Sequence, residues 1–260
     1  MIARNVIDNN FATSGGGIAV SPNSQIVHNR ISNNMGYYFG GGVELNGAGN
    51  AFIEDNEILG NTAWEQGGGF WIVNESDEII VQNLIANNWS PSGSQIYSLV
   101  PQSSVGFRLI NNTIVSSTPA SIGHPTPDAA VVADGFNTNV LIVNNIIFAP
   151  VNGAALLCNP IYQDGPPVVQ NNDAFNTLGV SYGDSCAGMD GTQGNISGNS
   201  EFVRLGKIRY ELQPNSPAIN AGTDSAPDLP KKDLAGHPRM VGGTIDIGAY
   251  EYQGKESNRK

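Results

Sequence analysis

A recurring asparagine places the strongest limit on how this chain can fold. Strings such as IARNVIDNN, IVHNRISNN and IVQNLIANN repeat through the first 176 residues, each with an asparagine at its centre. Successive anchors are 24, 27, 27, 29, 33 and 27 residues apart, with apolar residues three positions before and two positions after each one. Such periods indicate stacked structural repeats. The anchor asparagines are Asn5, Asn29, Asn56, Asn83, Asn112, Asn145 and Asn172.

A second repeated segment begins about ten residues after each early anchor. Runs of three glycines at 15–17, 40–42 and 67–69 lead into short apolar segments. Apolar residues alternate with outward positions there, which is the period-two pattern of strands with one buried face. The first residues of these predicted strands are Ile18, Val43, Phe70, Ile96, Val131 and Leu156.

The two repeated segments predict a solenoid of stacked coils, because one coil alone cannot bury its apolar face. We predict an all-β, right-handed parallel β-helix of about seven or more coils in residues 1–200, with an irregular coil or loop at 177–200. Residues 201–253 are predicted to form a C-terminal cap on the helix end, since an open strand edge must be shielded. Residues 254–260 are predicted to be a disordered tail. The anchors are expected at tight bends, because asparagine tolerates left-handed backbone and its amides can stack in a ladder.

Charge is distributed unevenly along the chain. The net charge is −11, and residues 1–200 hold fifteen acidic but only three basic side chains. A body with so few cations cannot neutralise phosphates, which argues against nucleic-acid partners. It also argues against anionic polysaccharides, unless Ca²⁺ bridges the two. No apolar run approaches the ~20 residues of a membrane span, so membrane insertion is not expected.

The segments GGGIAV, GGGVEL and GGGFWI, with the asparagine strings, resemble the repeats of pectate-lyase-like β-helix proteins and of polymorphic bacterial surface proteins. The ending, SPAINAG and then DLAGHPRMVGGTIDIGAYEYQ, resembles that of bacterial β-helix proteins called choice-of-anchor Q proteins. These resemblances imply secretion or display at the cell surface, often facing polysaccharide. They imply no single activity, because function depends on the site rather than the fold.

One outward row of the glycine-led strands, with the turns before it, carries the residues best suited to bind a ligand. Aromatic rings beside a carboxylate suit stacking and hydrogen bonding with sugar rings. The alternative is that the turn aromatics fold over the coil edge, or that another coil or domain covers them. The candidates are Glu44, Trp71 and Tyr97 in the row, and Tyr37, Trp64 and Trp89 in the turns.

Carboxylates near this surface raise the question of catalysis. Glycoside hydrolysis needs two carboxylates, about 5–5.5 Å apart for retention of configuration or about 6.5–9.5 Å apart for inversion. Glu44 has no acidic neighbour in its own row, and Glu65 is the nearest candidate by register. We therefore hypothesise that Glu44 and Glu65 line a sugar-binding groove and form the catalytic pair if the protein is an enzyme. A glycoside hydrolase is favoured over a polysaccharide lyase, since the body has few basic side chains for proton abstraction.

Other charged groups on the coils favour structural interpretations. His28 and Asp55 occupy stacked outward positions, but no serine is placed by register for them to activate, so a surface hydrogen bond is favoured. Arg30 aligns with Glu57 one coil on, which predicts a surface ion pair.

One acidic turn offers oxygen ligands to a metal ion. Glu75, Asp77 and Glu78 crowd this turn and could bind Ca²⁺. A solvated acidic turn is the alternative. No cofactor is expected to be required, and Ca²⁺ is the one metal ion that the sequence suggests.

The chain has two cysteines, Cys158 and Cys186, which lie 28 residues apart, close to one coil. Stacked residues are ~4.8 Å apart, inside the ~4.4–6.8 Å range for Cα atoms joined by a disulfide. A disulfide between adjacent coils and a pair of buried thiols are both compatible with this spacing.

Two functions of different classes follow. The first is a secreted carbohydrate-active β-helix protein that binds, and as an enzyme would hydrolyse, a neutral or weakly charged polysaccharide. The alternative is a non-catalytic cell-surface adhesin or structural rod. For both we expect a monomer that is part of a longer chain, located outside the cell or at its surface.

Overall fold

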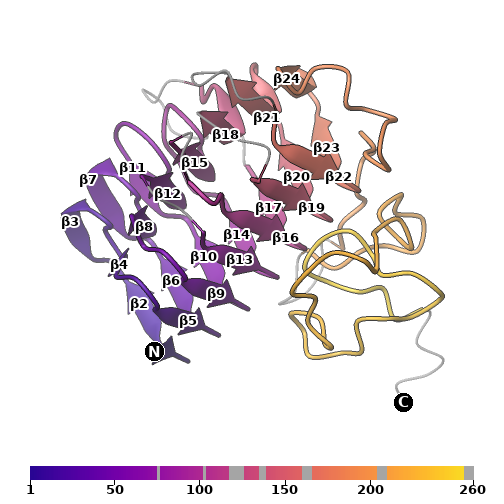
Figure 1. Ribbon diagram of the computed structural model, residues 1–260, viewed down its shortest axis with the longest axis horizontal. Coiled ribbons are helices and arrows are strands. Elements are labelled where there is room, and N and C mark those ends of the chain that lie inside the picture. The colour runs from indigo at the N-terminus through magenta and orange to yellow at the C-terminus, as the bar shows by residue number, and fades with distance from the viewer. Residues whose placement is uncertain are drawn as a thin grey trace.

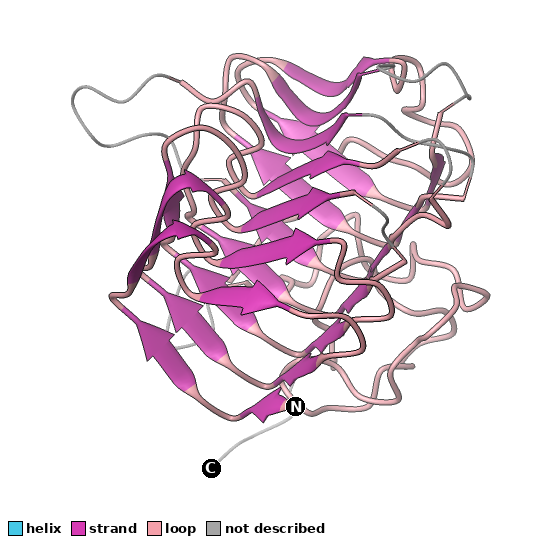
Figure 2. Ribbon diagram, turned by 60° about the vertical axis from the view of Figure 1, so that its left-hand side comes forward, coloured by secondary structure: helices cyan, strands magenta, loops and turns pink. Residues whose placement is uncertain are grey.

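The computed structural model describes residues 1–74, 77–101, 104–116, 126–134, 139–159, 166–203 and 210–254. Twenty-four short strands stack along one axis, and the described residues contain no helix. Figure 1 shows the N-terminus at one end of the stack, and Figure 2 shows the strands as parallel arrays joined by loops and turns.

The strands form four sheets, in which neighbouring strands come from successive coils. Sheet A consists of β1 (Ile2–Ala3), β5 (Gln25–Val27), β9 (Phe52–Glu54), β13 (Ile79–Val81), β16 (Arg108–Ile110), β19 (Leu141–Val143) and β22 (Val168–Gln170). Sheet B consists of β2 (Val6–Asp8), β6 (Arg30–Ser32), β10 (Glu57–Leu59), β14 (Leu84–Ala86), β17 (Thr113–Val115), β20 (Ile146–Ala149) and β23 (Asp173–Asn176). Sheet C has only β3 (Phe11–Ser14), β7 (Met35–Phe39) and β11 (Thr62–Ala63). Sheet D consists of β4 (Ile18–Val20), β8 (Val43–Asn46), β12 (Phe70–Val73), β15 (Ile96–Leu99), β18 (Ala129–Asp134), β21 (Ala154–Asn159) and β24 (Val180–Asp184).

Each coil contributes one strand to each of sheets A, B and D. Coils 1 to 3 comprise β1–β4, β5–β8 and β9–β12, and coils 4 to 7 comprise β13–β15, β16–β18, β19–β21 and β22–β24. Neighbouring strands in the sheets are parallel, and Ile26 pairs with both Ile2 and Ile53, as the anchor spacing predicts. Glu44 pairs with Ala19 and Trp71. The predicted all-β, parallel β-helix is therefore confirmed.

The anchor asparagines form a buried ladder along the bend between sheets A and B. Each side-chain Oδ1 accepts hydrogen bonds of 2.9–3.2 Å from the backbone N–H and the Nδ2 of the anchor one coil earlier. Asn195 adds an eighth rung after Asn172, which the sequence analysis did not identify. Buried amides are stable only when hydrogen-bonded, so the ladder fixes how the coils stack.

A second asparagine ladder follows the bend after sheet B in the first four coils. It runs through Asn10, Asn34, Asn61 and Asn88 and ends on the side-chain Oε1 of Gln95. The sequence analysis did not identify this ladder either.

The left-handed backbone at the first bend belongs to the residue before each anchor, not to the anchor itself. These residues have φ between 49° and 57°. Our expectation that the anchors themselves are left-handed was therefore wrong, and their contribution is the hydrogen-bonding side chain. We name the left-handed positions the corner row, and its members are Arg4, His28, Asp55, Gln82, Asn111, Asn144 and Asn171.

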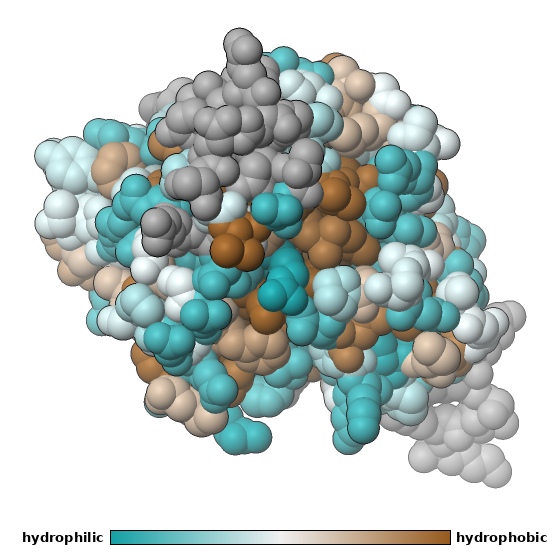
Figure 3. All heavy atoms as spheres, in the orientation of Figure 1, coloured by the Kyte–Doolittle hydropathy of each residue, from teal (hydrophilic) through white to brown (hydrophobic). Residues whose placement is uncertain are grey.

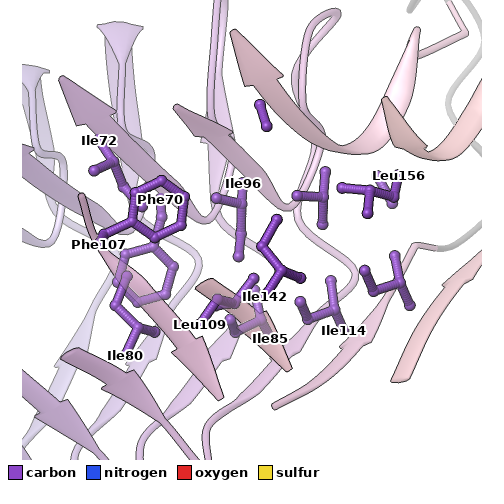
Figure 4. Packing of buried hydrophobic residues seen from close by; sticks show 14 of the residues in the cluster. Phe70, Ile72, Ile80, Ile85, Ile96, Phe107, Leu109, Ile114, Ile142 and Leu156 are labelled. Atoms are coloured by element: carbon purple, nitrogen blue, oxygen red, sulfur yellow. The ribbon is translucent and has the colours of Figure 1, made fainter. Parts of the chain in front are cut away.

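Inward side chains of sheets A, B and D meet in one core that runs through the coils. Figure 4 shows side chains from the three sheets pointing toward one another, among them Ile72, Ile80 and Ile85. All three are fully buried. The glycine runs serve close approach between coils, because a Cβ on Gly41 would lie 2.4 Å from the carbonyl oxygen of Thr62.

Residues 210–253, named the flank segment here, lie along the side of the stack (Figure 1, yellow-orange). The corner row holds this segment by hydrogen bonds to its backbone carbonyls. The donors and acceptors are Gln82 to Lys232 at 2.8 Å, Asn144 to Thr223 at 3.0 Å and Asn171 to Ala221 at 3.1 Å. We expected residues 201–253 over the helix end, whereas these contacts run back along the corner from coil 7 toward the earlier coils.

Apolar contacts join the same region to the outer face of sheet B. Leu84 and Val115 pack against Phe202, Tyr210 and Leu234. In Figure 3, hydrophobic residues gather near the middle of the face seen in Figure 1, with hydrophilic residues beside and below them. The flank segment therefore covers apolar surface that the coils leave on their outside.

In the flank segment, buried carboxylates rather than neighbouring strands accept the hydrogen bonds of several backbone N–H groups. Asp246 accepts hydrogen bonds from the N–H groups of Asn220 at 2.7 Å and Tyr252 at 2.6 Å. Asp233 and Glu251 each accept two further backbone N–H groups. All three carboxylates are buried, so the segment depends on a few buried acids.

One buried cation lies among these acids. Arg239 is 3% exposed and donates to the carbonyl oxygen of Gly248. Burial lowers the pKa of its guanidinium to about 10, and the carboxylates of Glu251, Asp233 and Asp246 oppose that effect. Their negative charge compensates a cation that burial alone would disfavour.

At the far end of the stack, Cys158 of β21 forms a disulfide with Cys186, with Cα atoms 5.5 Å apart. Of the two compatible alternatives, the structure therefore has the disulfide between adjacent coils. The tail predicted at 254–260 lies outside the described residues except for Gly254. In the described part of the chain, no helix is long and apolar enough to cross a membrane.

Candidate functional site

One extra residue in coils 2 and 3 pushes aromatic side chains outward at sheet C. Each of coils 1 to 4 has a glycine with left-handed backbone just before sheet D, at Gly15, Gly40, Gly67 and Gly93. Between the second-ladder asparagine and this glycine, coils 1 and 4 have four residues, while coils 2 and 3 have five. The pairing of β3 with β7 shifts register between Ala12 and Ser14 to absorb the difference. As a result Tyr37 is 50% exposed, Tyr38 41% and Trp64 49%.

Ring contacts join the two tyrosines of coil 2 to Trp71 of coil 3, and Trp64 lies beside them because Ala63, the residue before it, pairs with Gly36. Tyr37 meets Tyr38 edge to face at 4.7 Å, and Tyr38 lies 6.0 Å from Phe39. Phe39 stacks on Trp71 of β12 at 4.5 Å with an interplanar angle of 8°. We name Tyr37, Tyr38, Phe39, Trp64 and Trp71 the aromatic ledge.

Trp89 supports the ledge from the next coil. Its ring meets Trp64 edge to face at 6.0 Å. The Nε1 of Trp71 donates to Oε1 of Gln66 at 3.0 Å, which fixes the plane of that indole. Ring contacts and this hydrogen bond therefore hold the ledge in one shape before any ligand binds.

Tyr97 belongs to the predicted outward row but lies below the surface. It is 4% exposed, and its hydroxyl donates to Oδ2 of Asp134 at 2.7 Å. Burial and the Asp134 carboxylate raise the pKa of Tyr97 above its usual range. Of the predicted binding residues, the structure thus brings Tyr37, Trp64, Trp71 and Trp89 together, and it places Tyr97 where a large ligand cannot reach it.

The two candidate catalytic carboxylates belong to residues next to the ledge, since Glu44 pairs with Trp71 and Glu65 follows Trp64 in the chain. Glu44 is partly exposed in β8, and its carboxylate leans toward coil 1, because a Cβ on Gly15 would lie 3.1 Å from Glu44 Oε2. Glu65 is exposed in coil 3, where its backbone N–H donates to the carbonyl oxygen of Tyr38 at 3.0 Å. Glu44 therefore points away from the coil that carries Glu65.

The acidic turn proposed to bind Ca²⁺ is only partly described, because Glu75 lies outside the described residues. The Asp77 carboxylate accepts a hydrogen bond from the backbone N–H of Asn50 one coil earlier, and Glu78 is fully buried. Within the described ranges, no group of three or more His, Cys, Asp or Glu side chains is arranged to hold a metal ion.

Two ledge residues escaped the sequence analysis. Tyr38 occupies the extra position of coil 2, and Phe39 aligns with Ser14 and Gln66, so no aromatic ladder marks either one. The signal was the length of the run MGYYF, one residue longer than FATS at the same place in coil 1.

Comparison with known proteins finds one match. A protein-family model described as "Right handed beta helix region" matches residues 3–159, more than half of the chain. No curated protein and no solved structure matches. The ending at 216–253 lies beyond the matched region, so its resemblance to choice-of-anchor Q proteins stays a prediction.

Proposed function

The chain belongs to the right-handed β-helix family, and on this premise we propose that it binds a neutral or weakly charged polysaccharide through the aromatic ledge. The observation that carries the proposal is the exposure of Tyr37, Tyr38 and Trp64 on two adjacent coils. Aromatic side chains exposed singly are common on protein surfaces, whereas a group of them with polar tips is typical of a binding surface.

The spacing of the ledge suits an extended chain of sugar rings. Tyr37 and Trp64 come from adjacent coils, whose strands lie about 4.8 Å apart. Rings so placed offer successive apolar faces along the axis of the stack. A polymer that lies along this axis would meet one coil after another, so affinity would grow with its length.

The charges of the coils favour an uncharged polymer over an anionic one. Of the three basic residues in 1–200, Arg30 is paired with Glu57 at 2.7 Å and Arg108 with Asp228 at 2.6 Å. Neither guanidinium is therefore free to meet uronate carboxylates. The acidic excess around them would repel a polyanion.

Hydrolysis by Glu44 and Glu65 is the catalytic version of this proposal. Its support is that both residues border the ledge. The alternative of a non-catalytic adhesin or rod is favoured by the direction of Glu44, whose carboxylate leans over Gly15 and away from Glu65.

A panel of neutral polysaccharides, assayed by tryptophan fluorescence and by release of reducing ends, tests the proposal. We expect at least one polymer to change the fluorescence saturably. Tyr37→Ala and Trp64→Ala should each weaken that binding about tenfold or more, because anchor aromatics carry a large share of binding energy. Leu178→Ala, which truncates an exposed apolar side chain on coil 7, is the matched control and should bind normally.

Binding that survives both ledge variants would contradict the proposal. The catalytic version has its own test, since reducing-end release that is unchanged in Glu44→Gln and Glu65→Gln would exclude that pair. The disulfide supports a location outside the cytoplasm, where such bonds persist. Cell fractionation that found the protein in the cytoplasm with both thiols free would contradict that location.

A further inference from the structure

A cleft of about 360 Å³ opens between coils 2 and 3 and the flank segment, away from the aromatic ledge. Its walls combine titratable groups from the coils with apolar groups from the flank segment. The lining includes His28, Arg30, Asp55 and Glu57 of the coils, and Leu234 and Tyr250 of the flank segment.

The corner row changes its chemistry where this cleft opens. At positions 82, 111, 144 and 171 the row consists of amides, and each donates to a backbone carbonyl of the flank segment. The next two positions toward the N-terminus are Asp55 and His28, and both line the cleft. At these two positions the row therefore presents a carboxylate and an imidazole to the cleft instead of amide donors to the flank segment.

Three consecutive corner residues form a directed chain of contacts. Gln82 donates through Nε2 to Oδ1 of Asp55 at 2.7 Å, and Oδ2 of Asp55 lies 3.5 Å from Nδ1 of His28. The Asp55 side chain is 15% exposed and that of His28 is 46% exposed. Asp55 therefore lies on the Nδ1 side of the imidazole, and Nε2 is the ring nitrogen farther from that carboxylate.

The charges around the dyad disfavour an anionic ligand. Arg30 and Glu57 neutralise each other at 2.7 Å. Asp55 therefore supplies the only unbalanced charge among the four coil residues, and it would repel anions. Leu234, Ala235 and the small exposed part of Tyr250, which is 5% exposed, form the opposite, mostly apolar wall. A small cleft with an apolar wall and a few converging polar groups is typical of binding sites for small molecules.

We propose that this cleft is a separate binding site for a neutral, hydroxyl-rich ligand of mono- or disaccharide size. His28 and Asp55 hydrogen-bond its hydroxyl groups, and Leu234 and Tyr250 contact its apolar face. The proposal does not rest on the aromatic ledge, because none of the ledge residues lines the cleft.

The corner row itself supplies the variants for a test. Asparagine occupies this row at 111, 144 and 171 with the same left-handed backbone, so His28→Asn and Asp55→Asn should fold normally. Arg4→Asn makes the same kind of change in the row outside the cleft and is the matched control. Trp64→Ala removes a ledge residue and separates this site from the proposed polysaccharide surface.

The probes are glucose, cellobiose, maltose, lactose and xylobiose, each titrated to 50 mM with the full chain. Binding is read by saturation-transfer NMR on the sugar and by the ring signals of His28, assigned by their loss in His28→Asn. We expect at least one sugar to shift the His28 signals saturably. Its affinity should fall about tenfold or more in Asp55→Asn, and the saturation-transfer signal should fall likewise in His28→Asn.

Arg4→Asn and Trp64→Ala should leave this binding unchanged. The proposal is overturned if no sugar shifts the His28 signals, or if binding survives in both cleft variants at unchanged thermal stability. A His28 response to Zn²⁺ with none to any sugar would make the cleft a metal site instead. Loss of polysaccharide binding in Trp64→Ala with cleft binding intact would show two sites, so either proposal can fail alone.

Discussion

In the coils, the hydrogen bonds of one anchor asparagine are repeated by its neighbours, whereas in the flank segment each buried carboxylate bonds its own pair of backbone N–H groups. Asn83 has equivalents above and below it in Asn56 and Asn112. Asp246 has no such equivalent, because the groups it accepts from, Asn220 and Tyr252, lie far apart in the sequence.

This difference shows two ways in which a chain without helices can satisfy its buried backbone. Repetition spreads the task over many similar residues, and each coil depends mainly on its two neighbours. A segment without repeats must use side chains with several acceptor positions, and a carboxylate has two oxygens for this purpose. The flank segment should therefore be more sensitive than the coils to the loss of one polar side chain.

The largest effect is expected for Asp246→Ala. The change leaves two buried N–H groups without an acceptor and removes one of the carboxylates that compensate Arg239. We expect a loss of about 4 kcal/mol in the free energy of unfolding, measured by urea denaturation. Asp228→Asn, which removes the charge of a partly exposed acid paired with Arg108 and keeps a residue that tolerates its left-handed backbone, should cost less than about 1 kcal/mol. Equal losses for the two variants would contradict the comparison.

A smaller effect is expected for Asn83→Ala in the middle of the ladder. Its Oδ1 accepts from Asn56, and its Nδ2 donates to Asn112 and to the carbonyl oxygens of Ile53 and Val81. We expect a loss of about 3 kcal/mol, because neighbouring rungs can adjust only in part.

The control for that variant is Asn5→Ala, at the exposed first rung, which should cost about 1 kcal/mol or less. Both are measured by the same urea titration. If the loss for Asn83→Ala exceeded that for Asp246→Ala, the coils would be the more sensitive region, and the comparison would be reversed.

The smallest effect concerns Asp173, an acid within the coils. Burial raises the pKa of Asp173 to about 7, against hydrogen bonds from Ser200 and Gly198 that lower it. A carboxyl whose pKa is raised by folding stabilises the protein at low pH, and this stability is lost as the pH rises from about 4 to 7. Relative to Asp173→Asn, the wild type should lose about 1 kcal/mol between pH 6 and pH 7, the last step of this range.

Thermal unfolding of both proteins at pH 6 and at pH 7 measures this difference. The gap in Tm should change by about 2–4 °C in favour of Asp173→Asn as the pH rises. A gap that stays constant, or that moves the other way, would show that Asp173 is ionised in the folded protein throughout.

Sequence spacing alone predicted the register of three sheets. The pairing of Trp71 with Glu44 and Tyr97 follows directly, because one residue type recurs at one place in each coil and like positions must stack. The same logic predicted the ion pair of Arg30 with Glu57, which the structure confirms at 2.7 Å. The period of the sequence therefore determines most of the fold.

What the sequence did not predict lies where the period breaks. The ledge depends on Tyr38, an inserted residue that has no counterpart in coil 1. The path of the flank segment depends on contacts such as that of Gln82 with Lys232, 150 residues later in the chain. Such a contact joins a side chain to a backbone carbonyl. Every residue has this carbonyl, so the sequence does not mark which one is the partner. The cleft at His28 and Asp55 was missed for the same reason, since its second wall comes from this segment.

The anchor ladder also gives the stack a direction. Each rung donates from an earlier coil to a later one, from Asn5 to Asn29 and onward to Asn195, so the amide dipoles are aligned and polarise one another. A coil presented upside down would set oxygen against oxygen at this bend. The stack thus resembles a polar one-dimensional crystal, in which every completed layer is a template that accepts the next layer in a single orientation.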